Sequence, residues 1–144
     1  MITSVHGWIT GHEARRRLQE IRAFEETLAK NGTRVLKFFL HISKSEQKKR
    51  LLERLERPDK HWKYSPQDLK ERGYWSAYQK TFEQVLSATS TREAPWFVVP
   101  ADHKWFRDLV VASTLVRALE EMDPGAPKLR GLDWARLRRQ MMKS

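Results

Sequence analysis

Apolar residues recur every three or four positions across residues 11–30, as they do on one face of an α-helix. The repeat consists of Leu18, Ile21, Phe24 and Leu28. The following Asn31-Gly32 supplies a glycine, the residue best suited to a left-handed helix end. The pattern predicts a helix from Gly11 to Lys30 that stops at this pair.

Two short segments are instead almost continuously apolar and rich in β-prone residues. Residues 35–42 read Val-Leu-Lys-Phe-Phe-Leu-His-Ile, and residues 95–100 read Pro-Trp-Phe-Val-Val-Pro. Both are too short for a globular helix, and the first lacks the strict alternation of a half-exposed strand. The first segment predicts a strand covered on both faces, as in a parallel sheet, with His41 as a core residue, and the second segment predicts another short strand.

Helix signals follow each predicted strand. Ser43 and Glu46 have the spacing of a capping box, which starts a helix that ends before Pro58. Residues 57–64 are interpreted as a loop, and Ser65-Pro66 starts another apolar stripe that runs towards Ser90. That stripe comprises Trp75, Tyr78, Phe82, Val85 and Leu86, which we interpret as core residues.

A further helix is predicted after the second strand, with Asp102 as its possible N-cap. Its expected inner face consists of Phe106, Leu109, Val110, Ser113, Val116 and Leu119. A short basic helix is predicted over residues 133–142. Strands interleaved with helices indicate the α/β class, but two strands make an incomplete sheet, because most sheets hold about four to six.

Charge adds a partner class to this picture. The 144 residues contain 28 Lys and Arg against 18 Asp and Glu, a formal net charge of +10, which should attract polyanions. An ordinary solvated surface with a basic bias is the alternative. The chain has no cysteine, no apolar run long enough to cross a bilayer and no signal-peptide pattern at its start, so we expect a cytoplasmic protein without thiol chemistry.

The basic residues concentrate between residues 44 and 63, where eight Lys or Arg stand against four acids. Arg50, Arg54 and Arg57 have the spacing of one helical face, from which guanidinium groups can grip phosphate oxygens, and Lys60 and Lys63 could assist from the loop. The alternative is a charged surface helix with pairs such as Glu53–Arg57.

The predicted carboxyl ends of the strands lie near this cluster. Ligands of open α/β sheets bind beyond those ends, which here carry Lys44, Asp102 and Lys104. The 144 residues contain no G-x-x-x-x-G-K-[ST] phosphate-binding loop, and the five histidines form no metal-binding pair at helical spacing. No catalytic and no metal-ligating residue is predicted in the chain.

A longer series of motifs resembles the family-two polyphosphate kinases. It comprises residues 31–47, residues 50–69, Trp75-Ser76-Ala77-Tyr78, Thr89-Ser90-Thr91, Ala94-Pro95-Trp96 and Val99-Pro100-Ala101-Asp102-His103-Lys104-Trp105. The resemblance extends in order from about Val5 to Met122. It implies a nucleotide-kinase-like fold that moves phosphate between inorganic polyphosphate and nucleoside mono- or diphosphates, with Mg²⁺.

The resemblance also sets the expected organisation. The family's Walker A loop and Walker B aspartate precede the matched region, so we expect the C-terminal half of a P-loop kinase-like fold. Residues 1–122 would form a partial domain with a lid at about 44–75, and residues 123–144 a tail. The lid and strand ends would bind polyphosphate or nucleotide through Lys44, Arg50, Arg54, Arg57, Lys60, Lys63, Asp102 and Lys104, with no Mg²⁺ held by this chain alone.

The sequence supports one function first and leaves one alternative. We interpret the chain as a fragment of a polyphosphate:AMP/ADP phosphotransferase, inactive alone unless a complementary N-terminal polypeptide or a homo-oligomer completes it. The alternative is a basic module that binds polyphosphate or nucleic acid without chemistry. The sequence does not choose between AMP and ADP.

Overall fold

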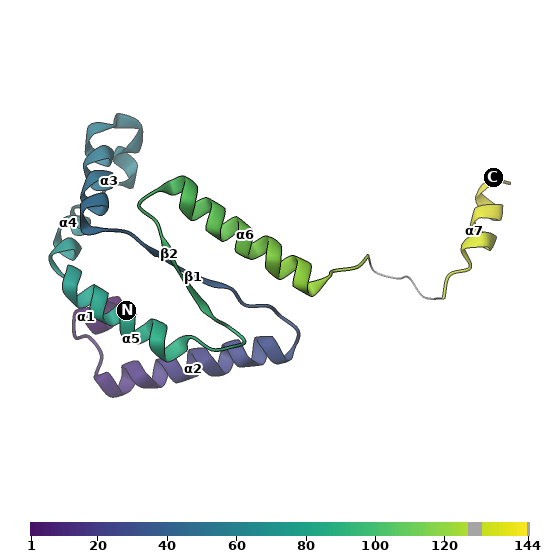
Figure 1. The fold of residues 1–144 in the computed structure, drawn as a ribbon, viewed down its shortest axis with the longest axis horizontal. Helices are drawn as coiled ribbons and strands as arrows, with labels where there is room; N and C mark the ends of the chain where they lie inside the picture. The colour runs from purple at the N-terminus through teal and green to yellow at the C-terminus, as the bar shows by residue number, and fades with distance from the viewer. Residues whose placement is uncertain (127–130, 144) are drawn as a thin grey trace.

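Two parallel strands cross the middle of the molecule, and helices flank them (Figure 1). The computed structural model describes residues 1–126 and 131–143. Strand β1 (Lys37–His41) pairs with β2 (Trp96–Pro100) in a register that aligns Lys37 with Trp96 and His41 with Pro100. The segment between them folds as α3 (Lys44–Glu56), the 3₁₀ helix η1 (Pro58–Lys63), α4 (Pro66–Gly73) and α5 (Trp75–Thr89). The predicted α/β class and parallel pairing are therefore confirmed.

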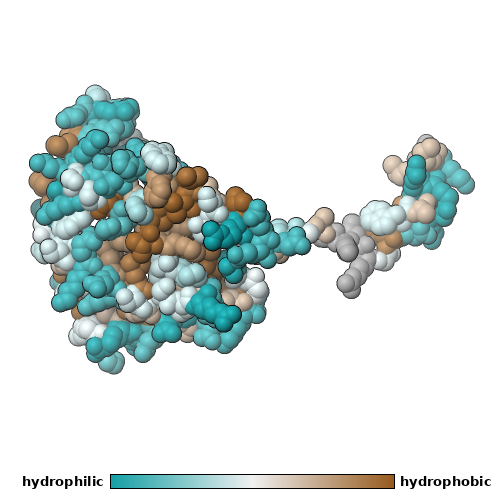
Figure 2. Space-filling model, viewed as in Figure 1, coloured by the Kyte–Doolittle hydropathy of each residue, from teal (hydrophilic) through white to brown (hydrophobic). Residues whose placement is uncertain are grey.

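The sheet is incomplete among the described residues, as predicted. Val99 is only 1% exposed, yet Leu40 is 46% and Val98 58% exposed. Figure 2 shows apolar atoms gathered over the middle of the viewed face, where the strands lie. The prediction that the first strand is covered on both faces is wrong at Leu40. His41 is exposed as well and contacts Gln79 at 3.3 Å, so its prediction as a core residue is also wrong.

Before the sheet come α1 (Ile2–Val5) and α2 (Gly11–Lys30), and the predicted bounds of α2 are confirmed. The hydroxyl of Thr10 accepts a hydrogen bond from the Glu13 amide at the start of α2. At its end Gly32 adopts φ +80°, and the Thr33 amide donates to the Leu28 carbonyl at 3.0 Å. A positive-φ glycine followed by this backbone hydrogen bond is typical of a Schellman motif, which explains why Asn31-Gly32 ends the helix.

The predicted stripe from Ser65 towards Ser90 forms two helices rather than one. Ser65 caps α4, and the chain bends at Tyr74 (φ −89°, ψ 17°) before α5 begins. The five stripe residues are half-buried rather than fully buried, and the rings of Trp75, Tyr78 and Phe82 line a cavity. Residues 58–63, predicted as part of a loop, form the 3₁₀ helix that turns the chain back from α3.

Helix α6 (Lys104–Met122) follows β2, but its inner face differs from the prediction. Ala118 is buried, and Val111 and Thr114 are half-buried on the same side, whereas Leu109 and Leu119 are each 55% exposed. Both sides of α6 are apolar, so periodicity alone could not identify the packed one. Helix α7 (Trp134–Met141), capped by Asp133, lies away from the rest of the molecule in Figure 1.

Candidate functional site

The carboxyl ends of the two strands are joined by a side chain from 59 residues away. The Asp102 carboxylate accepts a hydrogen bond from the Ser43 amide at 2.7 Å. Hydrogen bonds from Ser43, and next the charge of Arg50, hold the pKa of Asp102 below its usual value. Asp102 therefore secures the start of α3 rather than capping α6, whose N-cap is His103. The expectation that both strand ends meet at one edge is confirmed.

The capping box at Ser43 is only half formed, for the same reason. The Ser43 hydroxyl accepts from the Glu46 amide at 3.0 Å, as predicted. The Glu46 carboxylate does not return to Ser43 but pairs with Arg50 at 2.8 Å, and Asp102 takes the Ser43 amide instead. The N-terminal turn of α3 is thus fixed against the end of β2 through tertiary contacts.

Arg50 belongs to this junction. One of its terminal nitrogens donates to the Ala101 carbonyl at 2.6 Å and to the Asp102 carbonyl at 3.3 Å, and its side chain is largely buried. A guanidinium held by two carbonyls and a carboxylate has few donors left for a ligand. The Arg50 side chain therefore connects α3 to the end of β2.

The other predicted arginines are more accessible. Arg54 reaches the Lys63 carbonyl at 3.4 Å and Asp68 at 3.5 Å, both at the long end of hydrogen bonding. Arg57 lies one residue beyond α3 with an extended backbone, so it does not continue the helical face predicted for the three arginines. It forms a two-pronged pair with Asp59 at 2.9 and 3.1 Å.

The lysines also differ in whether their ammonium groups already have a partner. Lys60 pairs with Glu53, and Lys63 lies 4.8 Å from the centre of the Trp62 ring. Lys60, and more weakly Lys104 and Arg57, lower the pKa of Glu53. Within the described part of the chain, the ammonium groups of Lys44 and Lys104 form no ion pair with a carboxylate at these strand ends. The structure thus gathers all eight predicted residues along one path from the strand ends through α3 to η1.

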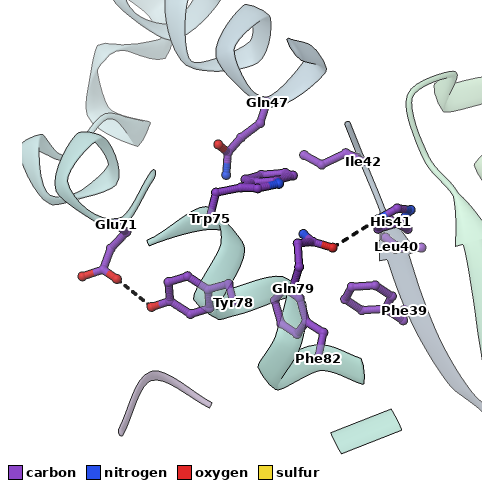
Figure 3. A pocket seen from close by; sticks show the side chains of 10 residues that line it. All are labelled: Phe39, Leu40, His41, Ile42, Gln47, Glu71, Trp75, Tyr78, Gln79 and Phe82. Atoms are coloured by element: carbon purple, nitrogen blue, oxygen red, sulfur yellow. Dashed lines mark hydrogen bonds between the residues drawn. The ribbon is translucent and has the colours of Figure 1, made fainter. Parts of the chain in front are cut away.

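A second feature of the site is a cavity of about 320 Å³ between β1 and the helices α4 and α5 (Figure 3). Phe39, Trp75 and Phe82 provide an apolar wall, and Gln79 and Glu71 add polar groups. Phe39 and Phe82 pack with ring centres 4.8 Å apart. The cavity lies beside β1, which among the described residues has one neighbouring strand, β2.

Glu71 is the most strongly perturbed acid along this cavity. It accepts hydrogen bonds from the Tyr78 hydroxyl at 2.6 Å, from Gln67 at 2.7 Å and from His6 at 3.0 Å. These bonds lower the pKa of Glu71 to about 2. Burial and the same carboxylate raise the pKa of Tyr78 to about 12. The sequence did not reveal this cluster, because His6 lies 65 residues from Glu71 and the four side chains match no functional motif.

The described residues contain no group of three or more His, Asp or Glu side chains arranged to hold a metal ion. No helix among them is both long and apolar enough to cross a membrane. Chemically, the site offers cations, helix-start amides and a carboxylate that is already engaged, a combination suited to holding phosphate oxygens.

Parallel strands with a helical crossover, and cations gathered beyond their carboxyl ends, define the chain as part of a P-loop kinase-like α/β fold. Residues 1–127 match the family model of polyphosphate kinase 2. The chain belongs to the polyphosphate kinase 2 family.

The relatives support this assignment in sequence. An AMP/ADP-polyphosphate phosphotransferase of Meiothermus ruber is 50% identical over 105 residues, which are 73% of this chain and 39% of that protein. An ADP-polyphosphate phosphotransferase of Rhodopseudomonas palustris is 41% identical over 131 residues, 89% of this chain and 45% of that protein. A protein in the chlN 3′ region of Leptolyngbya boryana is 47% identical over 112 residues, which are 78% of this chain and 82% of that protein.

Solved structures agree. Polyphosphate kinase 2 from Arthrobacter aurescens TC1 superposes with a TM-score of 0.93 at 44% identity, covering 100% of this chain and 50% of that one. A polyphosphate kinase 2 from Pseudomonas aeruginosa superposes with a TM-score of 0.80 at 31% identity, covering 88% of this chain and 27% of that one. The chain therefore spans less than half the length of these two named phosphotransferases and half of the Arthrobacter structure.

Proposed function

We propose that this chain supplies the lid and two sheet strands of a polyphosphate:nucleotide phosphotransferase acting on AMP or ADP. The observation that carries the proposal is the junction of Asp102 with the Ser43 amide at 2.7 Å. It brings Lys44, Lys104 and the start of α3 to one edge, where phosphates bind in this fold class. Residues 1–122 would form the partial domain, with residues 44–75 as its lid.

The cations of this edge would divide the work. Lys44 and Lys104 would meet phosphate directly, and Arg54 could exchange its two long contacts for phosphate oxygens. Arg57 would exchange its Asp59 partner in the same way, because an exposed ion pair contributes little stability. Lys60 and Lys63 would leave Glu53 and the Trp62 ring to meet phosphate. Arg50 and Asp102 would act by holding Ser43 and Lys44 in position.

We further propose that these 144 residues alone do not transfer phosphate. Phosphoryl transfer depends on positioning and on charge neutralisation by a phosphate loop, and the sequence contains no G-x-x-x-x-G-K-[ST] loop. The edge of β1 that does not pair with β2 offers a place for a further strand that would bring such a loop. That strand would come from another segment or from a complementary polypeptide.

That this chain alone holds no Mg²⁺ stays a prediction from the sequence, because Mg²⁺ in phosphate-transferring enzymes takes only one or two carboxylates beside waters and substrate phosphates. In the completed enzyme the ion would neutralise phosphate charge. Asp102 is engaged by the Ser43 amide, and its task is to keep the two strand ends together. A cytoplasmic location stays a prediction from the sequence.

Transfer activity tests the proposal in two forms. The purified chain, incubated with Mg²⁺, polyphosphate and ADP or AMP, should form no ATP or ADP above background. A chimera in which this chain replaces the matching 105 residues of the Meiothermus enzyme should be active. Formation of ATP or ADP by the chain alone would contradict the proposal that it is inactive by itself. A folded but inactive chimera would contradict the assignment of a phosphotransferase lid.

Retention of the chain on immobilised polyphosphate separates binding from chemistry. Replacing Lys44, Arg54 and Lys104 by alanine should weaken retention severalfold at low salt, with a smaller loss near 1 M salt, where charges are screened. The matched control is Lys80→Ala, which removes an exposed charge from α5. Strong retention by the chain, together with an inactive chimera, would favour the alternative of a non-catalytic basic module.

A further inference from the structure

Half of the net positive charge of the chain lies in residues 127–144. This segment contains six Lys or Arg and one Asp, a formal charge of +5, against +10 for the whole chain. Because the segment is one eighth of the chain, its charge density far exceeds that of the rest. Neighbouring cations act together on the same ligand, so this concentration attracts polyanions more strongly than an evenly spread charge does.

The cations in and just after α7 have no carboxylate partner among the residues that the structure describes. These cations are Arg136, Arg138, Arg139 and Lys143, and all four residues are exposed. The nearby Asp133 is engaged as the helix cap, since its carboxylate accepts the Arg136 amide at 2.9 Å. In the lid, by contrast, the exposed Arg57 already pairs with Asp59 at 2.9 Å. A ligand therefore reaches the α7 cations without displacing a carboxylate.

Three of these cations line one groove. Arg138, Arg139 and Lys143 border a groove of about 480 Å³, which Ala135 and Met142 also line. Guanidinium and ammonium groups bind phosphate oxygens through charge-assisted hydrogen bonds. The described residues that line the groove include no aromatic ring and no carboxylate. The groove therefore suits a ligand that consists of phosphate groups alone.

Two other polyanions match α7 less well. Single-stranded nucleic acids are held largely by stacking of their bases on aromatic side chains, which this groove does not offer. Attachment to an anionic membrane needs a large apolar face, and even one myristoyl chain gives only marginal binding. Helix α7 carries three large apolar side chains, those of Trp134, Leu137 and Met141. Inorganic polyphosphate needs neither bases nor an apolar face.

We propose that the α7 groove holds inorganic polyphosphate through the side chains of Arg138, Arg139 and Lys143, at a second site apart from the strand ends. In Figure 1 α7 lies well away from β1, β2 and α3, so the two sites share no side chain. A polyphosphate chain bound at α7 raises the local concentration of its free portion at the strand ends, because the second contact becomes intramolecular. This consequence rests on the proposed function, whereas binding at α7 does not.

Affinity for long-chain polyphosphate gives the first test. The α7 variant combines Arg138→Gln, Arg139→Gln and Lys143→Gln, which keep good helix formers in place. It should bind long-chain polyphosphate about tenfold more weakly than the unchanged chain at low salt, as three exposed charge contacts are lost. The slope of log affinity against log salt concentration should decrease by about 2, as it does when a single-stranded polyanion loses three charge contacts.

The matched control removes the same charge elsewhere. It combines Arg15→Gln, Arg22→Gln and Lys80→Gln, at exposed positions of α2 and α5. This control should bind nearly as tightly as the unchanged chain. An equal loss in the control and the α7 variant would show that affinity follows net charge, and would overturn the site.

The strand-end variant, in which Lys44, Arg54 and Lys104 are alanine, separates this proposal from the proposed function. It should keep part of its affinity for long-chain polyphosphate, and adding the α7 substitutions should remove that part. Complete loss in the strand-end variant, with no loss in the α7 variant, would overturn the α7 site and leave the proposed function standing. Tighter binding of the unchanged chain to single-stranded DNA of equal charge, or to vesicles with anionic lipid, would overturn polyphosphate as the ligand.

NMR locates the site without depending on an affinity difference. Long-chain polyphosphate should shift the backbone amide resonances of residues 135–143 in the unchanged chain. The resonances of residues 15–22 on α2, which are also rich in arginine, should stay in place. Unshifted α7 resonances at saturating polyphosphate would overturn the proposal.

Discussion

Arg50 and Arg57 have the same side chain, but their surroundings give them different tasks. Arg50 is largely buried and bonds to the Glu46 carboxylate and the Ala101 carbonyl, whereas Arg57 is half exposed and pairs with its neighbour Asp59. A buried strut stabilises the fold, while an exposed pair adds little.

We therefore predict that Arg50→Ala lowers the free energy of unfolding by about 2 kcal/mol, the scale of hydrogen bonds to a charged group. Arg57→Ala, the matched control, should leave unfolding unchanged within error. Urea denaturation of the two variants and the unchanged chain measures both effects. Equal stability of the two variants would show that Arg50 does not join α3 to β2.

The Glu71 cluster predicts an acid dependence of stability. Its folded pKa of about 2 lies below the ordinary value of 4.5, so its hydrogen bonds from Tyr78 and Gln67 stabilise the fold above pH 4.5. That contribution is lost as the pH falls from about 4.5 towards 2. Urea unfolding across this range should show a smaller loss for Glu71→Gln than for the unchanged chain.

Glu83→Gln on the exposed side of α5 is the control for this effect, because it removes a carboxylate outside the cluster. It should show the same acid loss as the unchanged chain. An identical loss in Glu71→Gln would mean that other carboxylates set the acid response.

At the residue scale, local sequence patterns singled out seven cations and Asp102 but did not show which partners each one has in the fold. Local spacing suggested one face for Arg50, Arg54 and Arg57, yet the backbone turns extended at Arg57 after Glu56. Neither the bond from Arg50 to Ala101 nor that from Asp102 to Ser43 could be predicted, because each joins residues more than 50 positions apart.

Among the elements, the end of α2 tests how far a single residue sets a helix boundary. Gly32 adopts φ +80°, which costs about 1–2 kcal/mol in a residue with a side chain. Gly32→Ala should lower the midpoint of thermal unfolding, even though the added methyl group meets no atom within 4 Å.

Gly11→Ala provides the control at the other end of the same helix. Gly11 also has open space around it but no positive φ, and alanine is the better helix former. This variant should be neutral or slightly stabilising. Equal destabilisation by both substitutions would show that backbone conformation is not the cause.

Most helices and both strands could be predicted because helix caps and apolar periodicity are local sequence patterns. Thr10 and Ser65 start helices by accepting amide hydrogen bonds from two or three residues ahead, and such signals are written in adjacent positions. The packed side of α6 was not predictable, since Leu109 and Val111 are equally apolar. Only the partner surface decides between them, and that is a tertiary property.

For the whole molecule, the open side of β1 predicts uneven amide protection. Alternate residues of a strand direct their amides to opposite sides, and the His41 carbonyl accepts from the Ala101 amide of the neighbouring segment. The amides of Phe39 and His41 should therefore exchange slowly with solvent deuterons. Those of Phe38 and Leu40 should exchange much faster, as measured by NMR.

The chimera with the Meiothermus enzyme provides the comparison, because there a further strand would cover this side of β1. Exchange at Leu40 should slow in the chimera while exchange at Phe39 stays the same. Slow exchange at Leu40 in the chain alone would mean that another segment already pairs with β1.

The long connection between the strands also governs how the chain acquires its shape. Ser43 and Asp102 meet across 59 residues, and the pairing of β1 with β2 spans a similar interval. Closing so large a loop costs entropy before any contact compensates, whereas the helices in between need only local contacts. During refolding from urea, helical circular dichroism should consequently return before the strands pair, and that late encounter should set the overall rate.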